Sequence, residues 1–489
     1  MTVAFAKCGS VAPVRFRTFA VSFAVGAGVL FGASGRAHAQ QKAEAPDAIT
    51  VGDFKLRPTF SVRTRAEYRH APTDLGGLAS SGSSAVIDDA WGIMERARLG
   101  LGVERGPIRG QVTLQDARVW GQTPPTGVAT APSAFASTGA FETWLEVRTS
   151  NATPSYLRIG RQTIEWGRFL GTADASIAAR SFDAARGHAA YKTLEFEGFA
   201  AFVDAPHPVG IGLGDVSGPY RGGAQLFGVQ AKWLPDPLFS VEIDGFARPA
   251  MGLAAPSVSR FAQSRAFGDL YAVALRFAGE GKGWKYDLTG ALQFGSIDFT
   301  SSFSKDRFAY AVAGDVQKTF DGLIGSPTLR LGAAYASGGE TDSGYHQFDP
   351  LYPDVHGPHG LMNSFAWSNV IDAHGALSVK PSADFGMGLE YRYMRLADLT
   401  GDWLDGYLVS SGRVPNATDA ELGHEIDFSL GWKPWPALEL AGGYSLLVLG
   451  RGAKEIALAQ GRVTREADGS ITLSPLAHFA FLQATLKIP

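Results

Sequence analysis

Apolar and polar residues alternate with a period of two along most of this chain. In residues 56–70, charged and polar side chains occupy one parity, and mostly apolar side chains occupy the other. Residues 91–104, 284–295 and 385–395 repeat the pattern, and residues 141–148 do so with Phe141 on the apolar parity. Because successive side chains of a strand point to opposite faces, each segment predicts a β-strand with one apolar and one polar face.

Eighteen segments predict strands in this way. They are residues 56–70, 91–104, 108–120, 141–149, 156–164, 187–191, 194–204, 225–234, 238–248, 267–278, 284–296, 307–320, 327–337, 368–380, 384–396, 422–433, 437–449 and 476–487. Short links, such as residues 106–107 and 434–436, alternate with much longer ones. Short turns on one side, long external loops on the other and an even strand number are typical of outer-membrane barrels. We therefore predict an all-β fold, a transmembrane antiparallel β-barrel of about 18 strands that is wide enough for an aqueous channel.

The amino terminus has the pattern of a Sec signal peptide. Lys7, Arg15 and Arg17 precede an apolar run at residues 19–33, and Ala37-His-Ala39 forms a small-residue cleavage site. This pattern predicts export to the cell outer membrane as a multi-pass barrel. The expected domains are a cleaved signal peptide at 1–39, a short polar lead at 40–54 and a single barrel domain at 55–489.

The composition of the remaining chain agrees with a barrel. The only cysteine, Cys8, lies within the predicted signal peptide, so neither a disulfide nor a lipoprotein anchor is expected. No later apolar run reaches the roughly 18 residues that a membrane-spanning helix needs. The chain has 60 glycines and 11% aromatic residues. A transmembrane β-barrel fits these features, since only alternate residues of its strands must be apolar.

Positive charge is concentrated in the first third of the chain. The whole sequence has a net charge of −3, and removal of residues 1–39 takes away four cations and no acid, which leaves −7. Residues 55–186 nevertheless contain 16 Lys and Arg against 12 Asp and Glu, a net of +4. A barrel with this distribution would carry a positive field along part of its lumen.

The arginines of this region fall mainly on the polar parity of their strands. This applies to Arg63, Arg65, Arg96, Arg98, Arg109, Arg148 and Arg158. Guanidinium groups recognise carboxylates through paired hydrogen bonds, so an inward row of them would suit anionic solutes. The alternative interpretation is a salt-bridge lattice with Glu67, Glu95, Glu142 and Glu146 that stiffens the wall. Both interpretations can hold together.

Residues 156–186 contain five arginines and three acids without a helix-length apolar stripe. We assign Arg161, Arg180, Asp183 and Arg186 to a strand end and a long loop. The hypothesis is that this loop turns into the barrel, that Asp183 pairs with Arg180 or Arg186 to hold it, and that it forms part of a constriction. The alternative is a solvated basic loop outside the barrel.

Several short motifs occur in a fixed order along residues 56–487. They are Arg63-Thr-Arg65, Glu95-Arg-Ala-Arg98, Leu157-Arg-Ile-Gly-Arg-Gln162, Arg180-Ser-Phe-Asp183, Phe348-Asp-Pro-Leu-Tyr-Pro353, Leu422-Gly-His-Glu-Ile-Asp427 and Gly443-Tyr-Ser445. The ordered set resembles the alginate-export family of outer-membrane porins. The resemblance implies an eighteen-stranded barrel with an electropositive lumen, through which arginines and lysines conduct an anionic polyuronate outward.

The predicted function is an outer-membrane channel with an arginine-lined lumen that passes anionic solutes. The predicted cargo is an anionic, alginate-like polysaccharide that is exported, and the alternative is a general or substrate-selective porin that takes up small organic anions. The pattern of a barrel does not state the direction of transport. The expected partners are the solute, the lipid bilayer with its lipopolysaccharide, and periplasmic export partners; no nucleic acid is expected.

Enzymatic and metal-dependent functions have weaker support in the sequence. There is no G-x-S-x-G motif, and no Ser/His/acid set is evident, so an outer-membrane hydrolase is not predicted. His346, Asp349, Asp354, His356 and His359 can bind metals, but their spacing matches no compact closed site. No cofactor is expected. A barrel with a plugged lumen and a purely structural role is a further alternative.

Overall fold

The structure is a computed structural model, and it describes most of the predicted barrel. The described residues are 48–70, 89–120, 136–150, 154–175, 179–204, 224–250, 268–300, 303–355, 359–406, 408, 410–413, 418–459 and 476–488. The predicted signal peptide lies outside them. Among the described residues, no helix is long and apolar enough to cross a membrane.

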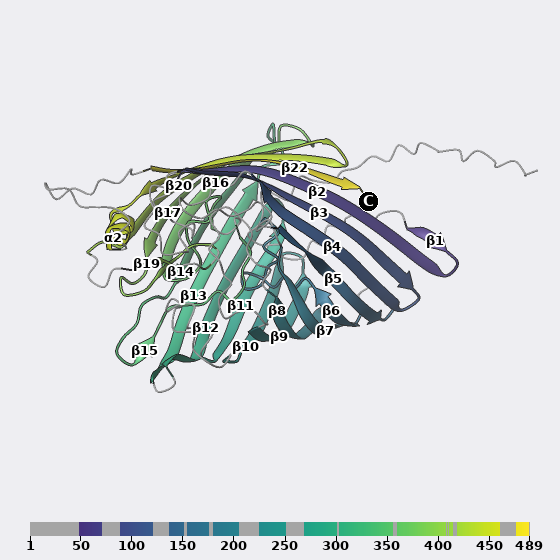
Figure 1. Ribbon diagram of the computed structural model, residues 1–489, viewed down its shortest axis with the longest axis horizontal. Helices are drawn as coiled ribbons and strands as arrows, with labels where there is room; N and C mark the ends of the chain where they lie inside the picture. The colour runs from purple at the N-terminus through teal and green to yellow at the C-terminus, as the bar shows by residue number, and fades with distance from the viewer. Residues whose placement is uncertain are drawn as a thin grey trace, which may run out of the picture.

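Within these ranges, eighteen antiparallel strands form one closed barrel (Figure 1). They are β2 (Phe54–His70), β3 (Asp89–Arg105), β4 (Ile108–Trp120), β5 (Ala136–Arg148), β6 (Tyr156–Gln162), β7 (Ser181–Tyr191), β8 (Leu194–Asp204), β9 (Ala224–Asp236), β10 (Phe239–Arg248), β11 (Leu270–Gly281), β12 (Trp284–Thr300), β13 (Phe303–Thr319), β14 (Thr328–Ala336), β16 (Val370–Val379), β17 (Phe385–Leu396), β20 (Glu421–Trp435), β21 (Leu438–Leu449) and β22 (Leu476–Ile488). Each pairs with the strand before and after it. Pairing of β2 with β22 closes the barrel, and the two strands lie side by side in Figure 1.

Four short strands and one helix accompany the barrel. β1 (Ile49–Val51) pairs with the start of β2, and β15 (Gly344–Tyr345) pairs in parallel with β13. β18 (Trp403–Leu404) and β19 (Ser410–Gly412) pair with each other. The helix α2 (Arg451–Ala459) follows β21, in the connection to β22. β15 lies between β14 and β16, β18 and β19 lie between β17 and β20, and α2 lies between β21 and β22.

The alternating pattern separates an outer face from a buried inner face. On the outer face, Leu99, Ile159 and Val229 are 59%, 58% and 66% exposed. Trp91, Trp120, Trp233, Trp284 and Trp435 are also exposed and lie near strand ends. An apolar outer band with aromatic residues at its borders is characteristic of a barrel in an outer membrane. The fold class predicted from the sequence is therefore confirmed.

Several predicted strand boundaries are wrong. β7 begins at Ser181, six positions before the predicted start at 187. Its first part has an inverted pattern, because Phe182 is completely buried while Asp183 has the parity of the exposed Tyr191. β12 and β13 continue through polar cross-strand pairs, so only residues 301–302 separate them where a longer loop was expected.

A β-bulge explains a wrong assignment in β5. The pairing of β4 with β5 shifts register between Thr113 and Leu114, so Glu142 and Phe141 both turn inward. Phe141 is only 7% exposed, and its ring lies under the guanidinium of Arg98 at 3.8 Å. The extra residue of a bulge cannot be recognised from the alternation of polarity alone.

Candidate functional site: the charged interior of the barrel

The central arginines of β2 and β3 lie on the inner face of the barrel. Arg63 and Arg96 are register partners, and they are 6% and 7% exposed. Arg65 forms an ion pair with Glu67 at 2.6 Å, and its guanidinium lies 4.0 Å from the centre of the Phe481 ring. Adjacent guanidinium groups repel each other, so this part of the wall favours an anionic partner.

That partner is Asp174, in the connection between β6 and β7. Its Oδ1 atom lies 3.1 Å from Arg96 Nη2 and 3.0 Å from Arg98 Nη1. The backbone oxygen of Asp174 accepts hydrogen bonds from Arg63 Nη1 at 2.5 Å and from Arg96 Nη1 at 3.0 Å. Burial alone would raise the pKa of Asp174, but the three guanidinium groups outweigh it and hold that pKa well below its usual range. The connection therefore turns into the barrel and reaches β2 and β3.

A second group of arginines lies nearer the short turns. Arg109 Nη2 is 3.2 Å from Glu104, while Arg158 Nη2 and Arg148 Nε are 2.6 and 3.7 Å from Glu146. These contacts are the kind of wall lattice that the alternative interpretation described. Positively charged side chains thus follow the inner face of β2 to β6 from the short-turn side to the middle of the barrel.

The hypothesis about the partner of Asp183 is wrong. Asp183 is a strand residue of β7 and the register partner of Arg161 on β6. Arg161 Nε and Nη2 donate to the two carboxylate oxygens of Asp183, both at 2.8 Å. Arg161 has the parity of the exposed Leu157 and Ile159, so this pair lies on the outer face, at the long-loop end of the strands.

Arg180 and Arg186 have separate inward roles. Arg180 Nη1 donates to the backbone oxygens of Gly171, Tyr352 and Pro353, at 3.0, 2.6 and 3.0 Å. It therefore joins the β6–β7 connection to the connection between β14 and β16. Arg186 is paired with Glu197 on the neighbouring strand at 2.8 Å.

The two connections pack together through aromatic side chains. Phe169 lies 5.3 Å from Phe246 and 5.7 Å from Trp367, measured between ring centres, and Phe348 lies 5.1 Å from Trp367. Backbone hydrogen bonds from Tyr352 N to Phe169 O and from Gly171 N to Tyr352 O, both 2.9 Å, add to this packing. The rings of Phe169, Phe246, Phe348 and Trp367 thus form an aromatic partition inside the barrel.

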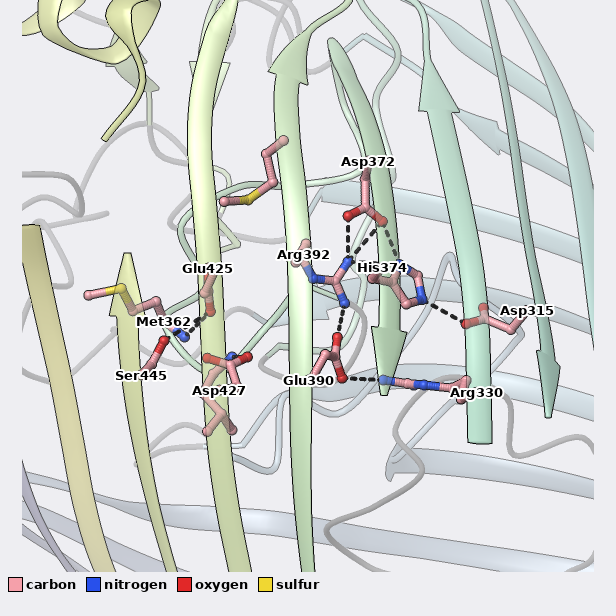
Figure 2. Close-up of polar contacts among 12 residues, drawn as sticks. Asp315, Arg330, Met362, Asp372, His374, Glu390, Arg392, Glu425, Asp427 and Ser445 are labelled. Carbon is pink, nitrogen blue, oxygen red and sulfur yellow. Dashed lines mark hydrogen bonds and ion pairs between the residues drawn. The ribbon is translucent and has the colours of Figure 1, made fainter. Parts of the chain in front are cut away.

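The wall formed by β13 to β21 carries an ion network rich in carboxylates (Figure 2). Arg392 is almost completely buried and donates to both oxygens of Asp372 at 2.8 Å and to Glu390 at 2.5 Å. His374 lies between Asp372 and Asp315, with 2.9 Å to each. Arg330 pairs with the other oxygen of Glu390, as the dashed line in Figure 2 shows.

Two further acids of this wall accept hydrogen bonds from the β14–β16 connection and hold it against the wall. Glu425 accepts hydrogen bonds from Met362 N at 3.0 Å and from Ser364 Oγ at 2.8 Å. Asp427 accepts one from Leu361 N at 2.9 Å. Both carboxylates are on β20 and both point toward the same loop backbone in Figure 2.

The β6–β7 connection contacts both walls of the barrel. Arg168 pairs with Asp315 on the carboxylate-rich side, whereas Asp174 pairs with the arginines of β3. The connection thus presents a cation to the acidic wall and an anion to the basic wall. Opposite charges on the two walls set up an electric field across the barrel interior.

Sequence reasoning had not included this acidic wall in the site. Its members are Asp315, Asp372, His374, Glu390, Arg392, Glu425 and Asp427, all on the inner face. The parity rule used for the first two strands would have found them. Arg168 and Asp174 had no such signal, since they lie in an irregular connection. Glu95 has the parity of exposed residues and is outside the proposed lattice.

The metal-capable residues of the β14–β16 connection are not assembled into a site in the part of the chain that is described. No group of three His, Cys, Asp or Glu side chains converges there as metal ligands. Asp349 pairs with Arg248 at 2.6 Å, and His346 Nδ1 lies 2.9 Å from Phe308 O. His356 lies outside the described residues.

A closed eighteen-stranded barrel with an apolar outer band and a charged interior defines a porin-type outer-membrane channel. The chain belongs to the alginate-export family: the family model described as Alginate export matches residues 55–209 and 245–461. A comparison with curated proteins gives no match.

Solved outer-membrane proteins share the fold at low sequence identity. OccK2 (OpdF) of Pseudomonas aeruginosa is 11% identical with a TM-score of 0.54, and the match covers 88% of this chain and 97% of that one. A BenF-like porin of Pseudomonas fluorescens Pf-5 is 10% identical with a TM-score of 0.54, over 88% and 98% of the two chains. A structure of OccK2 in complex with glucuronate gives 11% identity and a TM-score of 0.53, over 88% and 96%.

Proposed function

We propose that this channel passes carboxylate-bearing solutes along its inner arginines. The observation that carries the proposal is the group of Arg63, Arg96 and Arg98 around Asp174, with Arg96 and Arg98 on its carboxylate and Arg63 on its backbone oxygen. Three neighbouring guanidinium groups on one part of the wall attract anions. The function is transport without catalysis.

The positions of the other arginines support a path instead of a single site. Arg109, Arg148 and Arg158 lie between the short turns and the central group, each beside a glutamate. A solute with repeated carboxylates could move from one arginine to the next. At each arginine, a solute carboxylate replaces the glutamate in a hydrogen bond of similar strength. Weak binding at several sites favours conduction over trapping.

The proposed cargo is an anionic, alginate-like polyuronate that moves outward. The description of the family, Alginate export, supports this choice. Uptake of small organic anions is the second candidate, and the glucuronate complex of OccK2 favours it. Gene neighbours for polymer synthesis would support the first candidate, and those for organic acid catabolism the second.

Reversal potentials in planar bilayers test the proposal. The wild-type channel should prefer anions, and Arg63→Glu with Arg98→Glu should abolish or reverse the preference. Arg105→Glu is a matched control, since Arg105 is 59% exposed and pairs with Asp53 outside the barrel interior. A cation-selective wild type, or a double variant that keeps the wild-type preference, would contradict the proposal.

A further inference from the structure

We infer that Arg63, Arg96 and Arg98 form a carboxylate-binding site whose internal occupant is Asp174, and that the carboxylate of a passing solute displaces Asp174 from it. The inference rests on the proposed function, because it requires anionic solutes to reach these arginines. It adds a ligand class to the site and a competing group from the protein itself.

The geometry of Asp174 matches what a uronate presents. Arg96 Nη2 and Arg98 Nη1 contact the carboxylate at 3.1 and 3.0 Å, and Arg63 and Arg96 contact the adjacent backbone oxygen. A uronate offers the same arrangement, a carboxylate with ring and hydroxyl oxygens beside it. Hydrogen bonds from a guanidinium group to a carboxylate are charge-assisted and stronger than neutral ones, so the two ligands compete for the same donors.

Arg63 and Arg96 are buried in the wall, and Arg98 has partners other than Asp174. Arg98 donates from Nε to Gln115 at 2.9 Å and stacks on Phe141. Arg96 is 7% exposed, whereas the side chain of Asp174 is 53% exposed. A solute can therefore approach the carboxylate of Asp174 while the guanidinium groups keep their positions in the wall.

The segment that carries Asp174 is anchored on its other side. Gly171 approaches the neighbouring connection so closely that a Cβ atom there would lie 2.7 Å from the Cβ of Asp354. Arg180 holds the backbone oxygen of Gly171 at 3.0 Å, and Ala173 adopts a left-handed φ of 50°. Asp174 can thus leave the arginines by a local change at residues 172–175, with the aromatic packing of Phe169 retained.

Block of the single-channel current by glucuronate tests the competition. An attached ligand competes at a high effective concentration, so Asp174→Asn should lower the apparent Kd for glucuronate by roughly tenfold or more. Asp183→Asn is the matched control, because Asp183 pairs with Arg161 on the outer face, and its apparent Kd should equal that of the wild type. Equal apparent Kd values in the wild type and Asp174→Asn, or weaker binding in Asp174→Asn, would overturn the inference.

A spin label at Ala175→Cys gives a second measurement, independent of current. The label should be immobile in the wild type, become mobile when glucuronate is added, and remain immobile with uncharged glucose. With Asp174→Asn it should be mobile without any solute. A label that stays immobile in Asp174→Asn would overturn the inference. If the proposed function fails instead, glucuronate blocks neither protein; if only this inference fails, it blocks both with equal affinity.

Discussion

At the scale of single residues, the charged side chains of the interior differ in how completely they are neutralised. Arg392 has two carboxylates within 2.8 Å and is almost fully buried. Removal of one partner from a buried ion pair leaves an uncompensated charge and costs on the order of 3–5 kcal/mol, so the members of this network depend on each other. Arg96 and Arg98 share the half-exposed carboxylate of Asp174, whose backbone oxygen accepts a hydrogen bond from Arg63.

The pair formed by Arg161 and Asp183 gives a residue-scale prediction. The two side chains are 28% and 46% exposed, and exposed ion pairs contribute roughly 0–1 kcal/mol to stability. Asp183→Ala should therefore leave the conductance and anion preference unchanged and lower the unfolding temperature only slightly. Single-channel recording and thermal unfolding measure these effects. A changed conductance would place the pair in the conducting path after all.

His359 gives a prediction about pH. It packs on Phe365 with 5.4 Å between ring centres, and burial, with Arg392 next, lowers the pKa of His359 to about 3. When the β14–β16 connection is detached from the barrel wall, His359 titrates near the ordinary histidine value of about 6.5. Between these two pKa values, protons therefore bind preferentially to the detached state. The attachment of the β14–β16 connection to the barrel wall should be most stable above about pH 6.5 and weaken as the pH falls toward 3.

The measurement is the gating noise of the channel between pH 7 and 4. Noise should rise with acidification in the wild type, because the β14–β16 connection detaches from the wall more often. His359→Phe should remove the part of this rise that comes from the loop, because it keeps an aromatic ring without a titrating group. His424→Phe, at a half-exposed position on β20, should keep the acid response. Equal noise profiles in all three proteins would contradict the explanation.

At the scale of elements, the strands were predictable and the connections were not. Alternation fixes β2 to β4 closely because each has one face toward lipid, where polar side chains are excluded. That constraint ends outside the membrane. There the predicted start of β7 and the predicted loop between β12 and β13 were wrong. Asp174 could not be assigned from sequence, since its contacts depend on a connection that crosses the lumen.

The aromatic partition gives an element-scale prediction. Phe169 is completely buried and contacts rings from β10 and from the β14–β16 connection. Truncation of a buried phenylalanine costs about 3–5 kcal/mol, which would loosen the docking of both connections. Phe169→Ala should therefore raise the mean conductance and its noise in bilayers. Phe308→Ala, on the lipid-facing side at 53% exposure, should not. If Phe169→Ala conducts as the wild type does, the partition does not restrict the pore.

At the scale of the whole molecule, the barrel separates charge across its lumen. Arginines of β2 to β6 occupy one wall, carboxylates of β13 to β21 occupy another, and the β6–β7 connection joins them through Arg168 and Asp174. The net charge of the complete sequence, −3, indicates neither the basic wall nor the carboxylate-rich wall. Under the proposed function, the distribution of charge around the barrel, more than its sum, decides which solutes enter.

This distribution predicts a salt-dependent selectivity. The field of the arginines acts over a Debye length of about 10 Å at 0.1 M salt and about 3 Å at 1 M. Anion preference should therefore be strong at 0.1 M and weaker at 1 M, since bulk ions screen the arginines in the wider parts of the lumen. Reversal potentials at a fixed salt ratio and rising mean concentration measure this change. Arg63→Glu with Arg98→Glu should flatten the dependence, and Arg105→Glu should retain it. A preference that is constant with salt in the wild type, or an unchanged salt dependence in the double variant, would contradict the explanation that solvated arginines of the wall set the selectivity.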